Sequence, residues 1–99
     1  MISLAAVEML AAELWPGALS GAATVPDARR GERLILVTTK ADAKRLDLAG
    51  FARARGASEM MVPAEVLALD KLPLLGSGKI DNIALTNFVR ERAKLEGAA

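Results

Sequence analysis

The sequence predicts an α+β fold, in which a small sheet of about three strands is flanked by helices in the order αββαβα. Three observations lead to this prediction. Apolar residues recur at helical spacing near both ends of the chain, two short apolar segments of strand character lie between them, and turn-forming residues separate the segments. The 99 residues contain no repeat and no low-complexity segment, so we expect one domain.

The first element is predicted to be a helix over Leu4–Trp15. Its apolar residues follow helical spacing, Ser3 is a suitable N-cap, and the pair Pro16-Gly17 ends the helix. We interpret the apolar stripe as the face that packs on the core, which is far commoner than a stripe that binds a partner helix.

Two strands are predicted next. Leu19–Val25 is short, rich in small residues and only weakly strand-like, whereas Arg33–Thr39 is apolar, β-branched and the best strand in the sequence. The turn-forming cluster Pro26–Gly31 separates them. The two strands can pair as a hairpin through a long polar loop, and the second is expected to be covered on at least one face.

A second helix is predicted to start at a cap formed by Asp42 or Asp47 and to run to about Arg55. Gly56 then occupies the position that favours glycine after a helix. The inner face of this helix is expected to carry Leu48, Phe51 and Ala52.

The last third of the chain contains a short helical turn at Ser58–Met61, a strand at Glu65–Leu69 and a final helix from about Asn82 to Glu96. A loop with the sequence DKLPLLGSGK connects the strand to this helix. In the final helix the following residues recur at intervals of three to four: Ile83, Leu85, Phe88, Val89 and Arg92.

The composition excludes several classes of function. Thirteen basic residues nearly balance twelve acidic ones, giving a formal net charge of +1, so nothing indicates a nucleic-acid partner. The chain has no cysteine and no histidine, which removes the usual nucleophilic pairs and the commonest metal ligands, and we predict no metal site. No apolar run approaches the roughly 18–20 residues that span a bilayer. The absence of cysteine is compatible with the cytosol, where we place the protein.

The loop before the final helix is the most unusual stretch. Two glycines, a serine and Lys79 lie between a strand and a helix, and such a loop can bring backbone N–H groups and a positive charge close to an anion. The phosphate-loop pattern nevertheless fails, because Pro73 stands at its first glycine and Ile80 replaces its hydroxyl residue. Taken alone, the GSGK string is more simply interpreted as a flexible turn with an exposed lysine.

The residues around this loop resemble the C-terminal subdomain of the adenylate-forming enzymes, which include acyl-CoA synthetases, luciferases and peptide-synthetase adenylation domains. The family pattern is a Val-Pro pair, a strand, an acidic-x-Leu-Pro stretch, a glycine loop ending in Gly-Lys, and a helix. This chain has Val62-Pro63, the strand Glu65–Leu69, then Asp70–Pro73 and Ser77–Lys79. The continuation Ile80–Leu85 is similar to the peptide-synthetase form G-K-x-D-R-x-A-L, with Asn in place of Arg.

The start of the chain is also similar to the family, so the resemblance covers nearly all of it. Val7-Glu8 match the end of the I-x-x-x-E-V/I-E run that opens the first subdomain helix, and Pro26-Asp27 with Gly31-Glu32 match a P-D-x-x-x-G-E turn. Within the family, the segments ELWP, VPDARRGERLILVTT and PLLGSGK are most similar to the acyl-ACP synthetase part of 2-acylglycerophosphoethanolamine acyltransferases.

The resemblance implies that residues 1–99 are the mobile C-terminal subdomain, or lid, of a longer acid–thiol ligase whose large N-terminal domain is absent here. Such an enzyme uses ATP and Mg²⁺, bound mainly by that large domain, to form acyl-AMP. A thiol of CoA or of acyl-carrier-protein phosphopantetheine then displaces AMP. The lid is expected to bind no cofactor by itself and to be inactive in isolation. The parent enzyme can associate with the inner membrane and belongs to fatty-acid or phospholipid metabolism.

The resemblance also assigns roles to the loop residues. Lys79 matches the adenylation lysine of the family, which holds the carboxylate and the α-phosphate region together while negative charge builds in the transition state. Gly76 and Gly78 shape the loop, and Ser77 bonds either the backbone or the ligand. For these three residues a structural role and a cofactor-binding role remain equally open.

Two alternatives stand beside these predictions. The chain can instead be a standalone α+β binding module without catalysis. Seven basic residues can also form a patch that attracts the acidic acyl carrier protein, although an ordinary solvated surface is the simpler interpretation. These seven are Arg29, Arg30, Lys40, Lys44, Arg45, Arg53 and Arg55.

Overall fold

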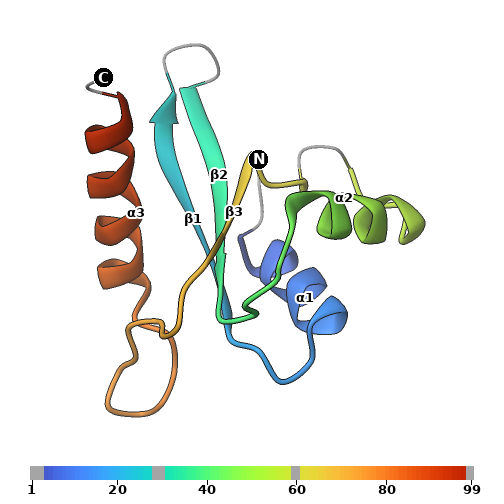
Figure 1. The fold of residues 1–99 in the computed structure, drawn as a ribbon, viewed down its shortest axis with the longest axis horizontal. Helices are drawn as coiled ribbons and strands as arrows, with labels where there is room; N and C mark the ends of the chain where they lie inside the picture. The colour runs from blue at the N-terminus through green and yellow to red at the C-terminus, as the bar shows by residue number, and fades with distance from the viewer. Residues whose placement is uncertain (1–3, 28–30, 59–60, 98–99) are drawn as a thin grey trace.

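A computed structural model describes residues 4–27, 31–58 and 61–97, and it has the predicted α+β architecture (Figure 1). The elements follow one another in the order α1, β1, β2, α2, β3 and α3, and the three strands form one sheet. Their bounds are α1 Leu4–Leu14, β1 Ser20–Asp27, β2 Gly31–Thr38, α2 Arg45–Ala54, β3 Glu65–Ala68 and α3 Asn82–Gly97. The predicted fold class and element order are therefore confirmed.

The sheet is mixed and has the strand order β1-β2-β3. β1 and β2 pair antiparallel from Ser20↔Thr38 to Asp27↔Gly31, while β2 and β3 pair in parallel. The predicted hairpin is thus confirmed, but the expected long loop is wrong. Only residues 28–30 lie between its paired ends, because the turn-forming residues Pro26 and Gly31 themselves belong to the ladder.

The sheet separates two apolar layers, with α1 and α2 on one face and α3 on the other (Figure 1). Alternate side chains of β2 supply both layers. Leu34 and Leu36 pack with α1 and α2, and Ile35 and Val37 pack on the side of α3. This is the expected pattern of a central strand that is buried on both faces.

The start of α2 differs from the prediction. Lys44 occupies the N-cap position and makes no side-chain cap, so neither Asp42 nor Asp47 caps the helix. Asp47 lies inside the first turn, where its charge still favours the helix dipole. The ammonium of Lys40, 3.3 Å from the Asp42 carboxylate, donates a hydrogen bond that lowers the pKa of Asp42.

The other helix ends agree with the prediction where the structure describes them. Gly56 follows α2 with a φ of +72°, in the left-handed region that glycine adopts without strain. Ser3 and part of the turn at 58–61 lie outside the described residues. In that turn the Met61 N–H donates to the Ser58 carbonyl. Phe51, which was expected on the inner face of α2, is only half-buried, and the Arg55 guanidinium lies 4.7 Å from the centre of its ring.

The outer edge of β1 is covered by two side chains. Glu8 on α1 accepts a hydrogen bond from the Ala22 N–H at 2.8 Å, and Arg90 on α3 donates to the Thr24 carbonyl at 3.2 Å. These contacts use backbone groups that would otherwise be free to pair with another strand. They also bind α1 and α3 to opposite sides of the same strand.

Candidate functional site

The GSGK segment is closed by hydrogen bonds into a small hairpin, which we call the lysine hairpin (residues 74–80). Leu74 and Ile80 form an antiparallel bridge at its base. The Leu75 N–H donates to the Lys79 carbonyl at 2.7 Å, and the Gly78 N–H donates to the Leu75 carbonyl at 2.9 Å. The backbone around Lys79 is therefore tied on both sides, and the interpretation of the segment as a plain flexible turn is not supported.

The two glycines of the hairpin are not equivalent. Gly78 has a φ of +90°, as a three-residue hairpin loop with a bulged glycine requires, whereas Gly76 has no positive φ. A Cβ atom on either glycine would meet nothing within 4 Å. Gly78 is therefore needed for the backbone path, and this feature of the geometry favours a structural role for it.

We expect Gly78→Ala to destabilise the protein by about 1–2 kcal/mol, because alanine is strained in the left-handed region. The matched variant Gly76→Ala should leave stability unchanged or raise it slightly. Urea unfolding of the two variants and the wild type measures the difference. Equal stabilities for the two variants would contradict the assignment of the bulge to Gly78.

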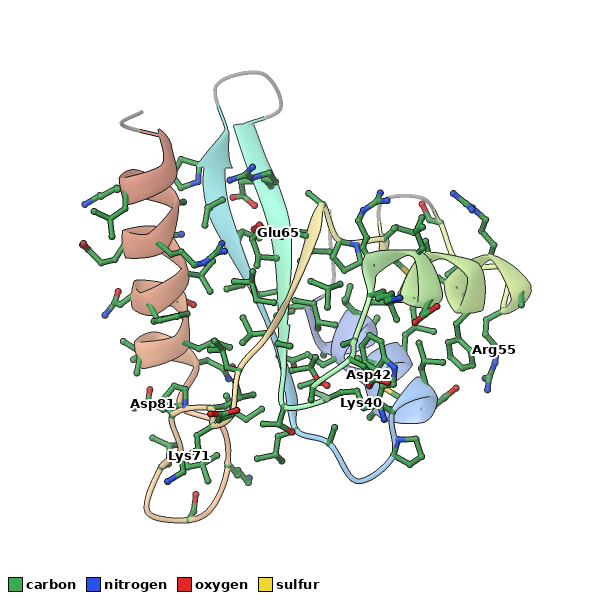
Figure 2. The ribbon with its side chains drawn as sticks, viewed as in Figure 1. Lys40, Asp42, Arg55, Glu65, Lys71 and Asp81 are labelled. Carbon is green, nitrogen blue, oxygen red and sulfur yellow. The ribbon has the colours of Figure 1, made fainter. Side chains whose placement is uncertain are left out.

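Asp81 joins the lysine hairpin to α3. Its backbone N–H donates to the Pro73 carbonyl at 2.8 Å, and its Oδ1 accepts from the Ala84 N–H at 3.1 Å, so Asp81 is the N-cap of α3. Sequence reasoning missed this role, although an aspartate directly before the helix at Asn82 is the ordinary capping signal. Figure 2 shows Asp81 and Lys71 near the hairpin.

Lys79 itself is exposed at the end of the hairpin. Among the residues that the structure describes, its side chain has no ion-pair or hydrogen-bond partner. Leu74 and Leu75, beside it, are each 49% exposed, although large apolar side chains generally pack inside. The site thus combines one unpaired ammonium with two incompletely buried leucines.

The exposed groups of the lysine hairpin are of the kind that bind anions in proteins. A lysine ammonium is a point charge that binds carboxylate or phosphate oxygens, and the N–H groups of Gly76 and Ser77 have no partner among the described residues. In open water such a charge is strongly screened, and its effect increases when another surface excludes water from it.

Of the seven basic residues, the described ones whose contacts are known are engaged locally and do not form a free patch. Lys40 pairs with Asp42, and the Arg55 guanidinium lies 2.6 Å from a Glu13 carboxylate oxygen. Arg45 donates through Nε to the Pro63 carbonyl, while Arg29 and Arg30 lie outside the described residues. For the described members, an ordinary surface with local pairs is the better interpretation.

Neither a metal-ligand cluster nor a membrane-spanning helix is present among the described residues. No three carboxylate side chains converge there in a way that could hold a metal ion. None of the described helices is long and apolar enough to cross a membrane.

A stretch of the sequence is similar to a much larger synthetase, which is found in two strains of the same species. Pyochelin synthetase PchF from Pseudomonas aeruginosa is 41% identical over 64 residues, which are 62% of this chain but only 4% of PchF. No family model matches the chain. The match therefore concerns a small part of a much longer synthetase.

Solved structures share the fold. MbtA from Mycobacterium smegmatis superposes with a TM-score of 0.77 at 22% identity, over 87% of this chain and 17% of MbtA. A fatty acyl CoA synthetase of Mycobacterium tuberculosis gives 0.78 at 17% identity, over 92% and 18% of the two chains. ATP-bound MatB from Rhodopseudomonas palustris gives 0.75 at 19% identity, over 91% and 18%. In each case the chain therefore shares its fold with a segment that makes up less than a fifth of the other protein.

Proposed function

We propose that this chain is the C-terminal, mobile domain of an ATP-dependent acid–thiol ligase and that Lys79 is its adenylation lysine. The observation that carries the proposal is the presentation of Lys79: a positive charge without a partner among the described residues, on a hairpin closed by backbone hydrogen bonds and attached to α3 through Asp81. The fold shared with ligases, the match to PchF and the motif that ends in Lys79 all support it.

The proposed chemistry follows from the charges involved. To form acyl-AMP, a substrate carboxylate must attack the α-phosphate of ATP, so two anionic groups must approach each other. An ammonium between them offsets their repulsion and stabilises the additional charge of the transition state. Pyrophosphate leaves in this step, and AMP leaves when a thiol attacks the acyl carbon in the second step.

In this proposal the remaining groups come from a large N-terminal domain, which binds ATP, Mg²⁺ and the acid. The two exposed leucines of the lysine hairpin agree with a contact that forms only when the two domains close. The thiol acceptor is CoA or acyl carrier protein. The similarity of ELWP and PLLGSGK to acyl-ACP synthetases favours acyl carrier protein, and with it a role in phospholipid metabolism.

The test compares ATP–pyrophosphate exchange in three samples: the parent ligase, the parent without residues 1–99, and this chain alone. We expect exchange only in the intact parent, because the anion-binding half of the site needs the other domain. Exchange by the chain alone would overturn the proposal. So would full activity of the shortened parent, which would show that residues 1–99 are not needed for adenylation.

A further inference from the structure

Gly21 on β1 lies beneath the junction between the lysine hairpin and α3. A Cβ atom on Gly21 would lie only 2.6 Å from Cδ2 of Leu85, and 3.5 and 3.6 Å from Cγ2 and Cδ1 of Ile80. Leu85 is fully buried, so its side chain has little room to turn away. The φ of Gly21 is not positive, and glycine is therefore required here for space and not for backbone conformation.

The two side chains above Gly21 belong to the residues that place Lys79. Ile80 follows Lys79 directly and forms the base of the lysine hairpin with Leu74. The Leu85 N–H donates a hydrogen bond to the Asp81 carbonyl. The Asp81 N–H in turn donates to the carbonyl of Pro73, which precedes the hairpin on its other side. A displacement of Ile80 and Leu85 would therefore move both ends of the hairpin.

We propose that Gly21 is a positioning residue for Lys79. By carrying no side chain, it lets Ile80 and Leu85 pack directly on β1, and this contact sets how far the lysine hairpin stands from the sheet. The inference rests on the proposed function for its catalytic consequence, but the placement of the hairpin can be tested without any activity. It also explains why a glycine stands at this position of β1, which has few strand-forming residues in its first half.

The adjacent residue provides a matched control. Ala22 is buried in the layer formed with α1 and α2, on the other face of the sheet from Leu85. Ala22→Val therefore crowds the core of the same strand without adding atoms next to Ile80 or Leu85. Both Gly21→Ala and Ala22→Val overpack a core and should lower the Tm, roughly 6–11 °C for each tenfold loss in the folding equilibrium constant.

The structural test measures amide hydrogen exchange at Leu75 and Gly78, whose N–H groups close the hairpin. Each variant is measured at the same interval below its own Tm. Under these conditions the amide exchange rates of Leu75 and Gly78 should be at least about tenfold higher in Gly21→Ala than in Ala22→Val. The double variant G21A/L85V, which removes the contacting Cδ2, should return them to the wild-type rate. Equal exchange in the two single variants would overturn the proposal. If Gly21→Ala does not fold, fast exchange in the double variant overturns it as well.

The functional test uses the parent ligase. Gly21→Ala should slow acyl-AMP formation at least about tenfold more than transfer from preformed acyl-AMP, whereas Ala22→Val should not separate the two half-reactions. If Lys79→Ala leaves adenylation unchanged, the proposed function fails and the exchange data alone decide the role of Gly21. A different result rejects the positioning role. In that case Lys79→Ala abolishes adenylation, while Gly21→Ala loosens the hairpin by hydrogen exchange but adenylates at the wild-type rate.

Discussion

Lys79→Ala in the parent ligase should lower the rate of ATP-dependent acyl-AMP formation on the order of 10²–10³-fold, the usual cost of removing one group that stabilises charge in a transition state. The same variant should keep transfer from preformed acyl-AMP to the thiol within about twofold of the wild type, since the reacting centre is then the acyl carbon and no carboxylate has to approach the α-phosphate in that step. ATP–pyrophosphate exchange measures the first half-reaction, and thioester formation from synthetic acyl-AMP measures the second.

Two controls make this result specific. Lys71→Ala removes another exposed lysine from the same connecting segment and should leave both half-reactions near the wild-type rates. Because Lys79 is exposed and has no partner among the described residues, its loss should also leave the Tm unchanged. Equal loss of the two half-reactions, or a matching loss in Lys71→Ala, would contradict the role of Lys79 in adenylation.

The largest effect on stability is expected for Leu36→Ala. Leu36 lies on the central strand β2, is fully buried, and belongs to the apolar layer that includes Trp15 and Leu48. Removal of its side chain leaves a cavity between the sheet and α1, at a cost of about 2–5 kcal/mol. Domains of this size have only about 5–15 kcal/mol in total, so the variant should be close to unfolding at physiological temperature.

Urea unfolding followed by Trp15 fluorescence measures this loss, because Trp15 is 7% exposed and reports on the same layer. The matched control is Leu46→Ala on α2, where the side chain is 75% exposed and its removal should change stability by less than about 0.5 kcal/mol. If the two variants were equally stable, the assignment of Leu36 to the core would be wrong.

Elements with a strong local pattern were predicted almost to the residue. The apolar spacing in α1 and the β-branched run in β2 reflect the face or faces that each element buries, so both are visible in the sequence. β1 was recognised only weakly, because its small residues satisfy contacts with residues far along the chain. Gly21 is small because Leu85 approaches it, and that contact joins residues 64 positions apart.

The helical spacing of residues in α3 predicted a wider buried face than the structure shows. Ile83 was grouped with the periodic residues of the last helix, yet it is 77% exposed, while Leu85 and Val89 are buried. A helix that lies on one side of a small sheet buries only part of its surface. Which of its apolar residues face the sheet depends on how the helix is rotated against the sheet, and spacing alone does not define this rotation. The cap of α2 also differs from the prediction, because the helix begins at Arg45, which places Asp47 inside its first turn, while the Asp42 carboxylate pairs with Lys40.

The sequence by itself determined the types and order of the elements, the exclusion of cysteine and histidine chemistry, and Lys79 as the residue of interest. These follow from local spacing and composition, which need no knowledge of distant contacts. Only the tertiary structure decided that the segment around Lys79 is a closed hairpin, that Asp81 joins it to α3, and that Gly21 leaves space beneath it. The reason is physical: these features consist of hydrogen bonds and close contacts between segments that meet only when the chain is folded.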